Sequence, residues 1–213
     1  VLRPLARGLA LGAGVCLAIV AVPLWWQFAG PRSYTSIWHP PGGNDLAQLW
    51  GRATRSIGAD VWASAALSMN RTEENSFFGI PLLLAAVAVV IALWRRPAVQ
   101  ALGVVVLISC WFSLGEEVVV NGRSTGIPAP GVLFEHVPIL ENVLPTRFAL
   151  IAVPALGALL AIGAEEVRRA VGRSSASPGA ALAAAAGAAG LVLIPVLRTP
   201  LVVDQRAPMP QFF

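Results

Sequence analysis

Five side chains stand out as groups able to do chemistry in this chain of 213 residues. The carboxylates of Glu116 and Glu117 directly follow an apolar stretch, and Arg123 lies in a polar, turn-rich segment just after them. His136 and Arg147 come later, before the next apolar stretch begins. A guanidinium binds a phosphate through paired hydrogen bonds, and carboxylates bind metal ions or hydroxyl groups. The segment 115–147 is therefore the predicted location of the chemistry.

Each of these residues has a plainer interpretation as well. We expect Arg147, with Arg123 as the second choice, to bind the phosphate of a lipid, although an arginine at the membrane surface also serves as a snorkelling anchor. Glu116, Glu117 and His136 are the predicted contacts to a metal or to an acceptor hydroxyl. Simple solvation of the two carboxylates at a helix end is the competing interpretation.

The sequence contains no recognisable metal-binding spacing. His39 and His136 stand alone in their segments, and Cys16 and Cys110 lie inside apolar stretches, where a thiol packs as a small hydrophobe. We therefore assign no metal ligands. A divalent cation at the glutamate pair is the one cofactor that the sequence leaves open.

Apolar stretches must position these groups, and the sequence has five of them. They cover residues 5–28, 78–93, 98–114, 148–162 and 180–197. Crossing about 30 Å of hydrocarbon takes about 20 apolar residues, with about 17 as the usual lower limit. The composition agrees, since 56% of the residues are hydrophobic, 12% are charged and the mean hydropathy is +0.72. The prediction is an all-α, polytopic transmembrane helix bundle of about five spans over residues 1–197.

Charge sets the predicted orientation of these spans. One predicted face of the membrane has the N-terminus and the connections between spans 2 and 3 and between spans 4 and 5. This face carries seven arginines but only two acids, Glu165 and Glu166, whereas the other face carries eight arginines and nine acids. Positively charged loops favour the cytoplasm. We therefore expect a multi-pass protein of the cell membrane with a cytoplasmic N-terminus. Its two long loops, residues 29–77 and 115–147, are predicted to be extracytoplasmic.

The two long loops should carry structure of their own, because loops beyond about 15 residues are usually functional or folded. In the first loop, apolar residues at helical spacing over 44–57 predict an amphipathic helix with Asp45 as its N-cap, lying either in the membrane interface or as a lid on other loops. In the second loop, residues 121–126 predict a hairpin and residues 132–140 a short helix.

Nucleic acid is not an expected partner. All 15 basic residues are arginine, which indicates a GC-rich genome, and no basic run is interleaved with aromatic residues. Membrane lipid is the partner that the composition predicts.

Three short motifs suggest a family. Residues 74–83 (ENSFFGIPLL), 125–130 (TGIPAP) and 140–148 (LENVLPTRF), in this order and separated by spans, resemble large polytopic proteins of high-GC, actinobacterial-type bacteria that are assigned to the GT-C superfamily of membrane glycosyltransferases. The resemblance covers about residues 23–150 and the tail from Arg198. It implies transfer of a hexosyl or pentosyl group from a polyprenyl-phosphate carrier to a glycan acceptor of the cell envelope, on the extracytoplasmic side.

The resemblance also implies that the chain is an internal or C-terminal fragment. The sequence starts at Val1 rather than at methionine, and residues 198–213 look like the truncated beginning of an extracytoplasmic segment. In the GT-C superfamily the catalytic acid typically lies in the first extracytoplasmic loop of the full protein. Nothing around Asp45 matches that acidic motif, so we assign no catalytic residue and expect that acid to be missing.

Two other functions stay open. A transporter or flippase is also polytopic, but the central parts of the five stretches lack the intramembrane charges that are typical of transport. A non-catalytic membrane scaffold of envelope assembly is the other alternative. Release of polyprenyl phosphate from a sugar-charged carrier separates an enzyme from a scaffold.

Overall fold

The computed structural model describes residues 2–31, 42–70, 72–133, 143–174 and 177–200, and the chain forms two units, Val1–Pro40 and Pro41–Phe213. The first unit consists of helix α1 (Leu2–Phe28), which has Pro23 in its interior. Its apolar side chains are exposed all round. A helix that is apolar on every face suits a lipid environment.

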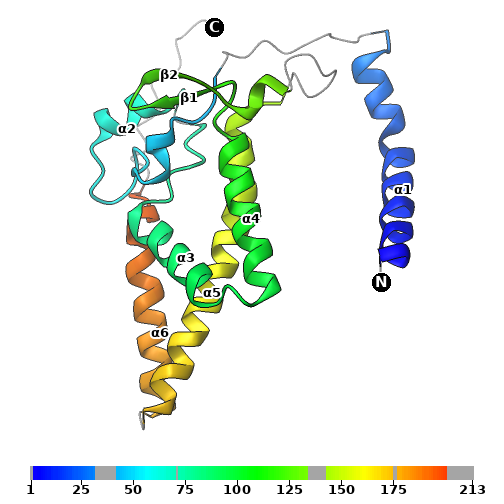
Figure 1. Ribbon diagram of the computed structural model, residues 1–213. Coiled ribbons are helices and arrows are strands. Elements are labelled where there is room, and N and C mark those ends of the chain that lie inside the picture. The colour runs from blue at the N-terminus through cyan, green and yellow to red at the C-terminus, as the bar shows by residue number, and fades with distance from the viewer. Residues whose placement is uncertain (1, 32–41, 71, 134–142, 175–176, 201–213) are drawn as a thin grey trace, which may run out of the picture. The chain divides into compact units, whose positions relative to one another are not determined.

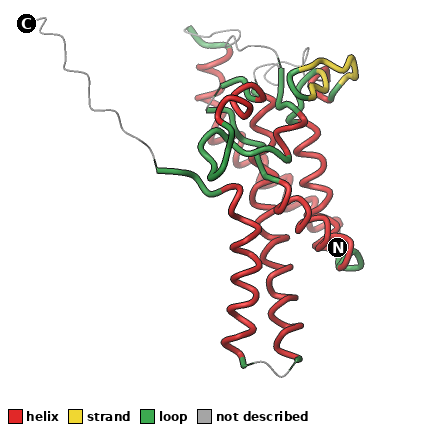
Figure 2. Tube along the Cα trace, turned by 90° about the vertical axis from the view of Figure 1, so that its left-hand side faces the viewer, coloured by secondary structure: helices red, strands yellow, loops and turns green. Residues whose placement is uncertain are grey.

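Four helices build the second unit: α3 (Ile80–Ala92), α4 (Pro97–Phe112), α5 (Ala149–Arg173) and α6 (Pro178–Leu193). Helix α5 packs against α3, α4 and α6, and α5 and α6 form a long antiparallel pair (Figures 1 and 2). Helices α3, α4 and α6 each have a proline in the first turn, where its missing N–H removes no helical hydrogen bond.

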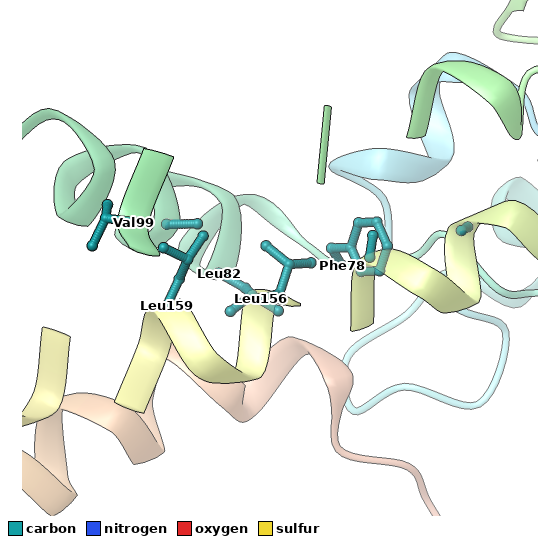
Figure 3. Close-up of a cluster of buried hydrophobic side chains, with 8 residues drawn as sticks. Phe78, Leu82, Val99, Leu156 and Leu159 are labelled. Atoms are coloured by element: carbon teal, nitrogen blue, oxygen red, sulfur yellow. The ribbon is translucent and has the colours of Figure 1, made fainter. Parts of the chain in front are cut away.

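The core of this unit lies where α3, α4 and α5 meet, as Figure 3 shows for five of its side chains. Leu156 and Leu159 of α5 are almost fully buried against Leu82 of α3 and Val99 of α4. On α5, Gly163 allows a close approach, since a Cβ there would lie 2.6 Å from a methyl group of Val89 on α3. Small residues at such contacts are typical of membrane helix pairs.

Length and composition support three of the five predicted spans. The segments Arg3–Gln27, Pro145–Arg173 and Pro178–Val196 are long and apolar enough to cross a membrane. Helices α3 and α4 are apolar but have only 13 and 16 residues. The predicted stretch 148–162 continues as a helix to Arg173, because ion pairs to Glu165 and Glu166 support its charged last turns.

The described residues 42–70, 72–77, 115–133 and 143–147 of the two long loops lie at the same end of the second unit and form what we call the cap (Figure 1). In its described residues the cap contains helix α2 and three short 3-10 helices, and a further short 3-10 helix at the end of α6 adjoins it. These elements are α2 (Val61–Leu67), η1 (Leu46–Leu49), η2 (Pro130–Leu133), η4 (Pro145–Phe148) and η5 (Ile194–Val196). The described parts of the two loops contact each other, with β1 of the second loop packed against η1 of the first.

The prediction of an all-α fold is wrong in one detail, because the cap includes a two-stranded antiparallel sheet. Strands β1 (Glu117–Val120) and β2 (Arg123–Pro128) form the predicted hairpin, with an irregularity between Glu117 and Val119. Asn121 and Gly122 at the turn both have positive φ, 51° and 73°. A two-residue turn of this kind matches the twist of paired strands.

The predicted amphipathic helix over 44–57 is also wrong. Only η1 forms there, and Asp45 is indeed its N-cap. The buried side chains of Asn44 and Gln48 bond to distant parts of the cap, to the carbonyls of Thr146 and Leu67, so tertiary contacts outweigh the helical spacing. Of the predicted helix 132–140, residues 132 and 133 belong to η2 and the remainder lies outside the described residues.

Three glycines join the two loops backbone to backbone. A Cβ at Gly43 would lie 2.1 Å from the carbonyl carbon of Leu114, and one at Gly131 would lie 2.3 Å from the carbonyl carbon of Gly115. Gly115 itself has φ +79°, a conformation that side chains disfavour. The amide of Gly131 donates to the carbonyl of Gly115 at 2.7 Å. This junction fixes the start of the second loop against the first.

Candidate functional site

A buried carboxylate ties the first loop to the start of α5. The side chain of Glu73 is only 7% exposed, and its oxygens accept hydrogen bonds from the Thr146 hydroxyl (2.8 Å), the Asn75 amide (3.0 Å) and the Arg147 guanidinium (3.2 Å). The Arg147 side chain is 63% exposed. Two of the three motifs that suggested the family, 74–83 and 140–148, thus meet beside Glu73.

A second buried carboxylate holds the hairpin. The Asp45 side chain accepts the backbone N–H groups of Ala47 (2.7 Å), Asn121 (3.0 Å) and Gly122 (2.6 Å). Asp45 is 4% exposed, so these bonds satisfy a charge that water barely reaches. One residue therefore caps η1 and fixes the turn of the hairpin next to Arg123.

Glu74, next to Glu73, is directed into a different part of the cap. Its carboxylate accepts the hydroxyl (2.6 Å) and the backbone N–H (3.2 Å) of Thr54. Ser76 donates to the side-chain oxygen of Gln48 at 2.6 Å. Glu73, Glu74 and Ser76 are all buried, so this acidic run lies inside the protein rather than on its surface.

A groove of about 320 Å³ opens between the cap and helices α3, α5 and α6, and we call it the cap groove. Four polar residues line its cap end: Ser56, Glu74, Asn75 and Arg198. Apolar side chains line the rest, among them Phe77, Phe78, Leu82, Val153, Leu156, Leu160, Leu193 and Val196. The groove is therefore amphipathic, with its polar groups gathered at the end where the helices meet the cap.

The chain after α6 returns to the first loop and places Arg198 at this groove. The N–H of Ile57 donates to Leu197 at 3.0 Å, and that of Thr199 donates to Arg55 at 2.7 Å, so Arg198 and Ser56 form a bridge. The Arg198 side chain is exposed and makes no ion pair or hydrogen bond with the described residues. Its guanidinium is available to an anion in the groove.

The structure does not gather the sequence-predicted site residues in one place. Arg147 pairs with Glu73, and Arg123 is exposed at the start of β2. Glu116 is half-buried, and its carbonyl accepts the N–H of Ala129 at 2.8 Å. None of these three residues lines the cap groove. The predicted contact His136 lies outside the described residues.

Glu117 has a structural partner set within the hairpin. Its carboxylate accepts the Ser124 hydroxyl and the N–H of Gly126, the latter at 2.5 Å. These bonds, that from Ser124 first, hold the pKa of Glu117 below its ordinary value. A carboxylate stabilised in its charged form is a weak base, so Glu117 serves the hairpin.

The polar residues of the cap groove are not recognisable as a site from the sequence. Glu74 and Asn75 belong to a motif that suggests the family, and Arg198 begins the tail included in that resemblance, but the motifs assign no role to any of the three. The feature of the sequence that could indicate a site is that Glu74, Asn75 and Arg198 lie next to the ends of predicted spans. Within residues 2–31, 42–70, 72–133, 143–174 and 177–200, no cluster of three or more His, Cys, Asp or Glu could hold a metal ion.

Comparison with known proteins gives no match to a protein family, to a curated protein or to a solved structure. The groove and its residues are therefore the features that indicate a function.

Proposed function

We propose that this chain is part of an integral membrane glycosyltransferase that uses a polyprenyl-phosphate-linked sugar and acts on the extracytoplasmic side. The observation that carries the proposal is the cap groove, whose apolar walls come from α3 and from two helices long and apolar enough to cross a membrane. Its polar end holds Arg198, which makes no ion pair with the described residues. A lipid-linked sugar has the same order of parts, a long hydrocarbon chain, a phosphate and a polar sugar. The resemblance of motifs 74–83 and 140–148 to the GT-C superfamily supports the same substrate class.

Each part of the groove has a proposed role. Arg198 binds the phosphate, because a guanidinium donates paired hydrogen bonds to phosphate oxygens. Glu74 and Asn75 bind hydroxyl groups of the sugar or of the acceptor. The apolar walls from α3, α5 and α6 hold the first part of the prenyl chain.

In the proposed transfer the oxygen of an acceptor hydroxyl bonds to the anomeric carbon and releases its proton to water, as the bond from that carbon to the phosphate oxygen breaks. Polyprenyl phosphate leaves, and a nearby cation stabilises the charge that develops on it. We assign no catalytic base. Glu74 already accepts two hydrogen bonds from Thr54, so we propose it as a binding group.

Arg147 and Arg123 stay as alternative phosphate contacts in this proposal, with Glu116 as an acceptor contact. Both arginines belong to the cap, but the ion pair with Glu73 partly neutralises Arg147. Arg198 is the better candidate, because it lines the groove and makes no ion pair with the described residues.

The test is a transfer assay with the full-length protein in liposomes, using a polyprenyl phosphate carrier charged with a radiolabelled sugar. We expect Arg198→Gln to lower kcat/KM for the donor by about 10- to 100-fold, since a charged hydrogen bond contributes about 1.5–3 kcal/mol. Arg52→Gln is the matched control, because Arg52 is exposed in the same cap and does not line the groove.

The other outcomes identify the alternatives. An equal loss in the Arg198 and Arg52 variants would refute the assignment of Arg198, and a selective loss in Arg147→Ala or Arg123→Ala would transfer the role to that arginine. Complete absence of polyprenyl phosphate release from any tested carrier would favour a scaffold. Movement of the intact labelled lipid across the bilayer without its cleavage would favour a flippase.

A further inference from the structure

We propose a binding site for an anionic glycerophospholipid in a second groove, which runs along the helices to the turn between α3 and α4. This inference is independent of the proposed glycosyltransferase function, because none of its polar groups belongs to the cap.

The second groove lies between α3, α4 and α5, reaches Leu49 of η1 in the cap and has a volume of about 250 Å³. The residues that carry the argument are Val87, Val90, Ile91 and Trp94 from the α3 side, with Val104 and Leu107 from α4. Val87, Ile91, Val104 and Leu107 are each about half exposed or more. A wholly apolar groove that opens to the membrane offers water no hydrogen bonds, so a hydrocarbon chain is the occupant that suits it.

Charge at the end of the groove points to the kind of lipid. Trp94 is 53% exposed in the turn between α3 and α4, and the exposed Arg95 and Arg96 follow it directly. An indole ring at the end of an apolar stretch marks the depth of the lipid headgroups. The groove therefore ends at the level where a phosphate would lie.

The neighbouring charged residues pair with one another, and no described residue forms an ion pair with Arg95. Arg96 pairs with Glu166 at 2.8 Å, and Glu165 receives both Arg168 and Arg169. Arg95 has no ion pair or hydrogen bond with any residue in the described ranges. Since Arg95 directly follows a residue of the groove wall, an anionic headgroup would neutralise it while one acyl chain fills the groove.

The experiment is native mass spectrometry of the full-length protein, purified in detergent and mixed with equal amounts of phosphatidylglycerol and phosphatidylcholine that carry identical acyl chains. We expect retained phosphatidylglycerol to exceed phosphatidylcholine by about fivefold, the preference that one arginine near a lipid surface gives. Arg95→Gln should bring this ratio close to one. Arg173→Gln, which removes an equal charge from the end of α5, should leave it unchanged.

Two further variants test the groove itself. Val104→Trp fills the groove and should lower lipid retention, whereas Leu182→Trp places the same side chain on an exposed face of α6 that lines no groove. Phosphatidylglycerol with brominated acyl chains should quench part of the tryptophan emission of the folded wild-type protein. This quenched part should be absent in Trp94→Phe, because it comes from Trp94.

An equal ratio for the two lipids in the wild type would overturn the proposal. Equal effects of Arg95→Gln and Arg173→Gln would also overturn it, because they would indicate general attraction by the basic end. The same holds if Val104→Trp and Leu182→Trp retain lipid equally, or if brominated lipid quenches the wild type and Trp94→Phe to the same extent.

Discussion

Single carboxylates decide how the cap is built. Asp45 is 4% exposed and serves three backbone N–H groups from two loops, and Glu73 joins the first loop to the start of α5 through Thr146 and Arg147. A buried charge costs free energy unless several donors surround it. Both residues meet this condition. The cap is therefore held by buried hydrogen bonds as well as by apolar packing.

Replacing Asp45 should loosen the hairpin. We expect Asp45→Ala to lower the free energy of unfolding by about 2–3 kcal/mol, because three N–H groups lose a charged acceptor and two of them belong to the turn. Asp60→Ala is the matched control, since Asp60 is an exposed N-cap of α2 and its loss should cost about 1 kcal/mol. Thermal unfolding in detergent measures both. Equal costs would show that the contacts of Asp45 with Asn121 and Gly122 add nothing.

The hairpin should also respond to acid through Glu117. The hydrogen bond from the Ser124 hydroxyl lowers the pKa of Glu117 in the folded protein most, and that from the Gly126 N–H lowers it further. The pKa of a glutamate in an unfolded chain is about 4.3. The stabilisation by charged Glu117 is therefore complete above the pKa of the unfolded state. It is lost as the pH falls through the lower pKa of the folded state. Amide exchange at Gly126, corrected for its intrinsic pH dependence, should accelerate in that acid window. Glu117→Gln should abolish the dependence, and an unchanged pH profile in this variant would contradict the role of Glu117.

At the scale of elements, the ion pair between Arg96 and Glu166 sets α4 and α5 in register. It places the turn before α4 at the same height along the helix axes as the first charged residues of α5, Glu165 and Glu166. From this level to the cap, α4 has 16 residues, which span about 24 Å at 1.5 Å per residue. The uncharged part of α5, residues 149–164, has the same length. Both helices thus fit a hydrocarbon layer thinner than the usual value of about 30 Å.

This match predicts a preference for thin bilayers. We expect the protein to unfold at a higher temperature in dimyristoleoyl phosphatidylcholine than in dierucoyl phosphatidylcholine, because a thick bilayer must thin around α3 and α4 at a cost of fractions of a kcal/mol per ångström. Thermal unfolding in vesicles of each lipid measures the difference. Equal unfolding temperatures would contradict the idea that α3 and α4 cross the same layer as α5.

Sequence patterns predicted the helices better than the cap. Continuous apolar runs identify α1, α3, α4, α5 and α6 because a membrane helix needs no partner to satisfy its backbone. The pattern over residues 44–57 failed, since the buried side chains of Asn44 and Gln48 bond to segments that lie far away in the sequence. The hairpin was predictable from its turn residues, Asn121 and Gly122.

The cap groove shows the same limit. Its polar residues Ser56, Glu74 and Arg198 come from three separate parts of the chain, and the bridge between residues 56 and 198 brings the last part to the first. Local spacing contains no information on such a pairing. The choice of Arg147 and Glu116 from the sequence followed depth in the membrane, which a single sequence does indicate.

At the scale of the whole molecule, the two ends of the second unit differ in charge and in structure. The end with the α3–α4 turn has five arginines, two glutamates and short connections, whereas the cap end has long folded loops and buried acids. A basic end with short connections is typical of the cytoplasmic side. The proposed sugar donor and the proposed anionic phospholipid would therefore bind at opposite faces of the membrane.

Accessibility of engineered thiols tests this orientation. Thr125 is exposed on β2 of the cap, and Arg169 is 51% exposed near the opposite end of α5. In a variant with both native cysteines replaced by serine, we expect Thr125→Cys to react with a membrane-impermeant maleimide on intact cells, and Arg169→Cys to react only after permeabilisation. Labelling of Arg169→Cys alone on intact cells would place the cap groove in the cytoplasm, where an extracytoplasmic sugar donor could not reach it.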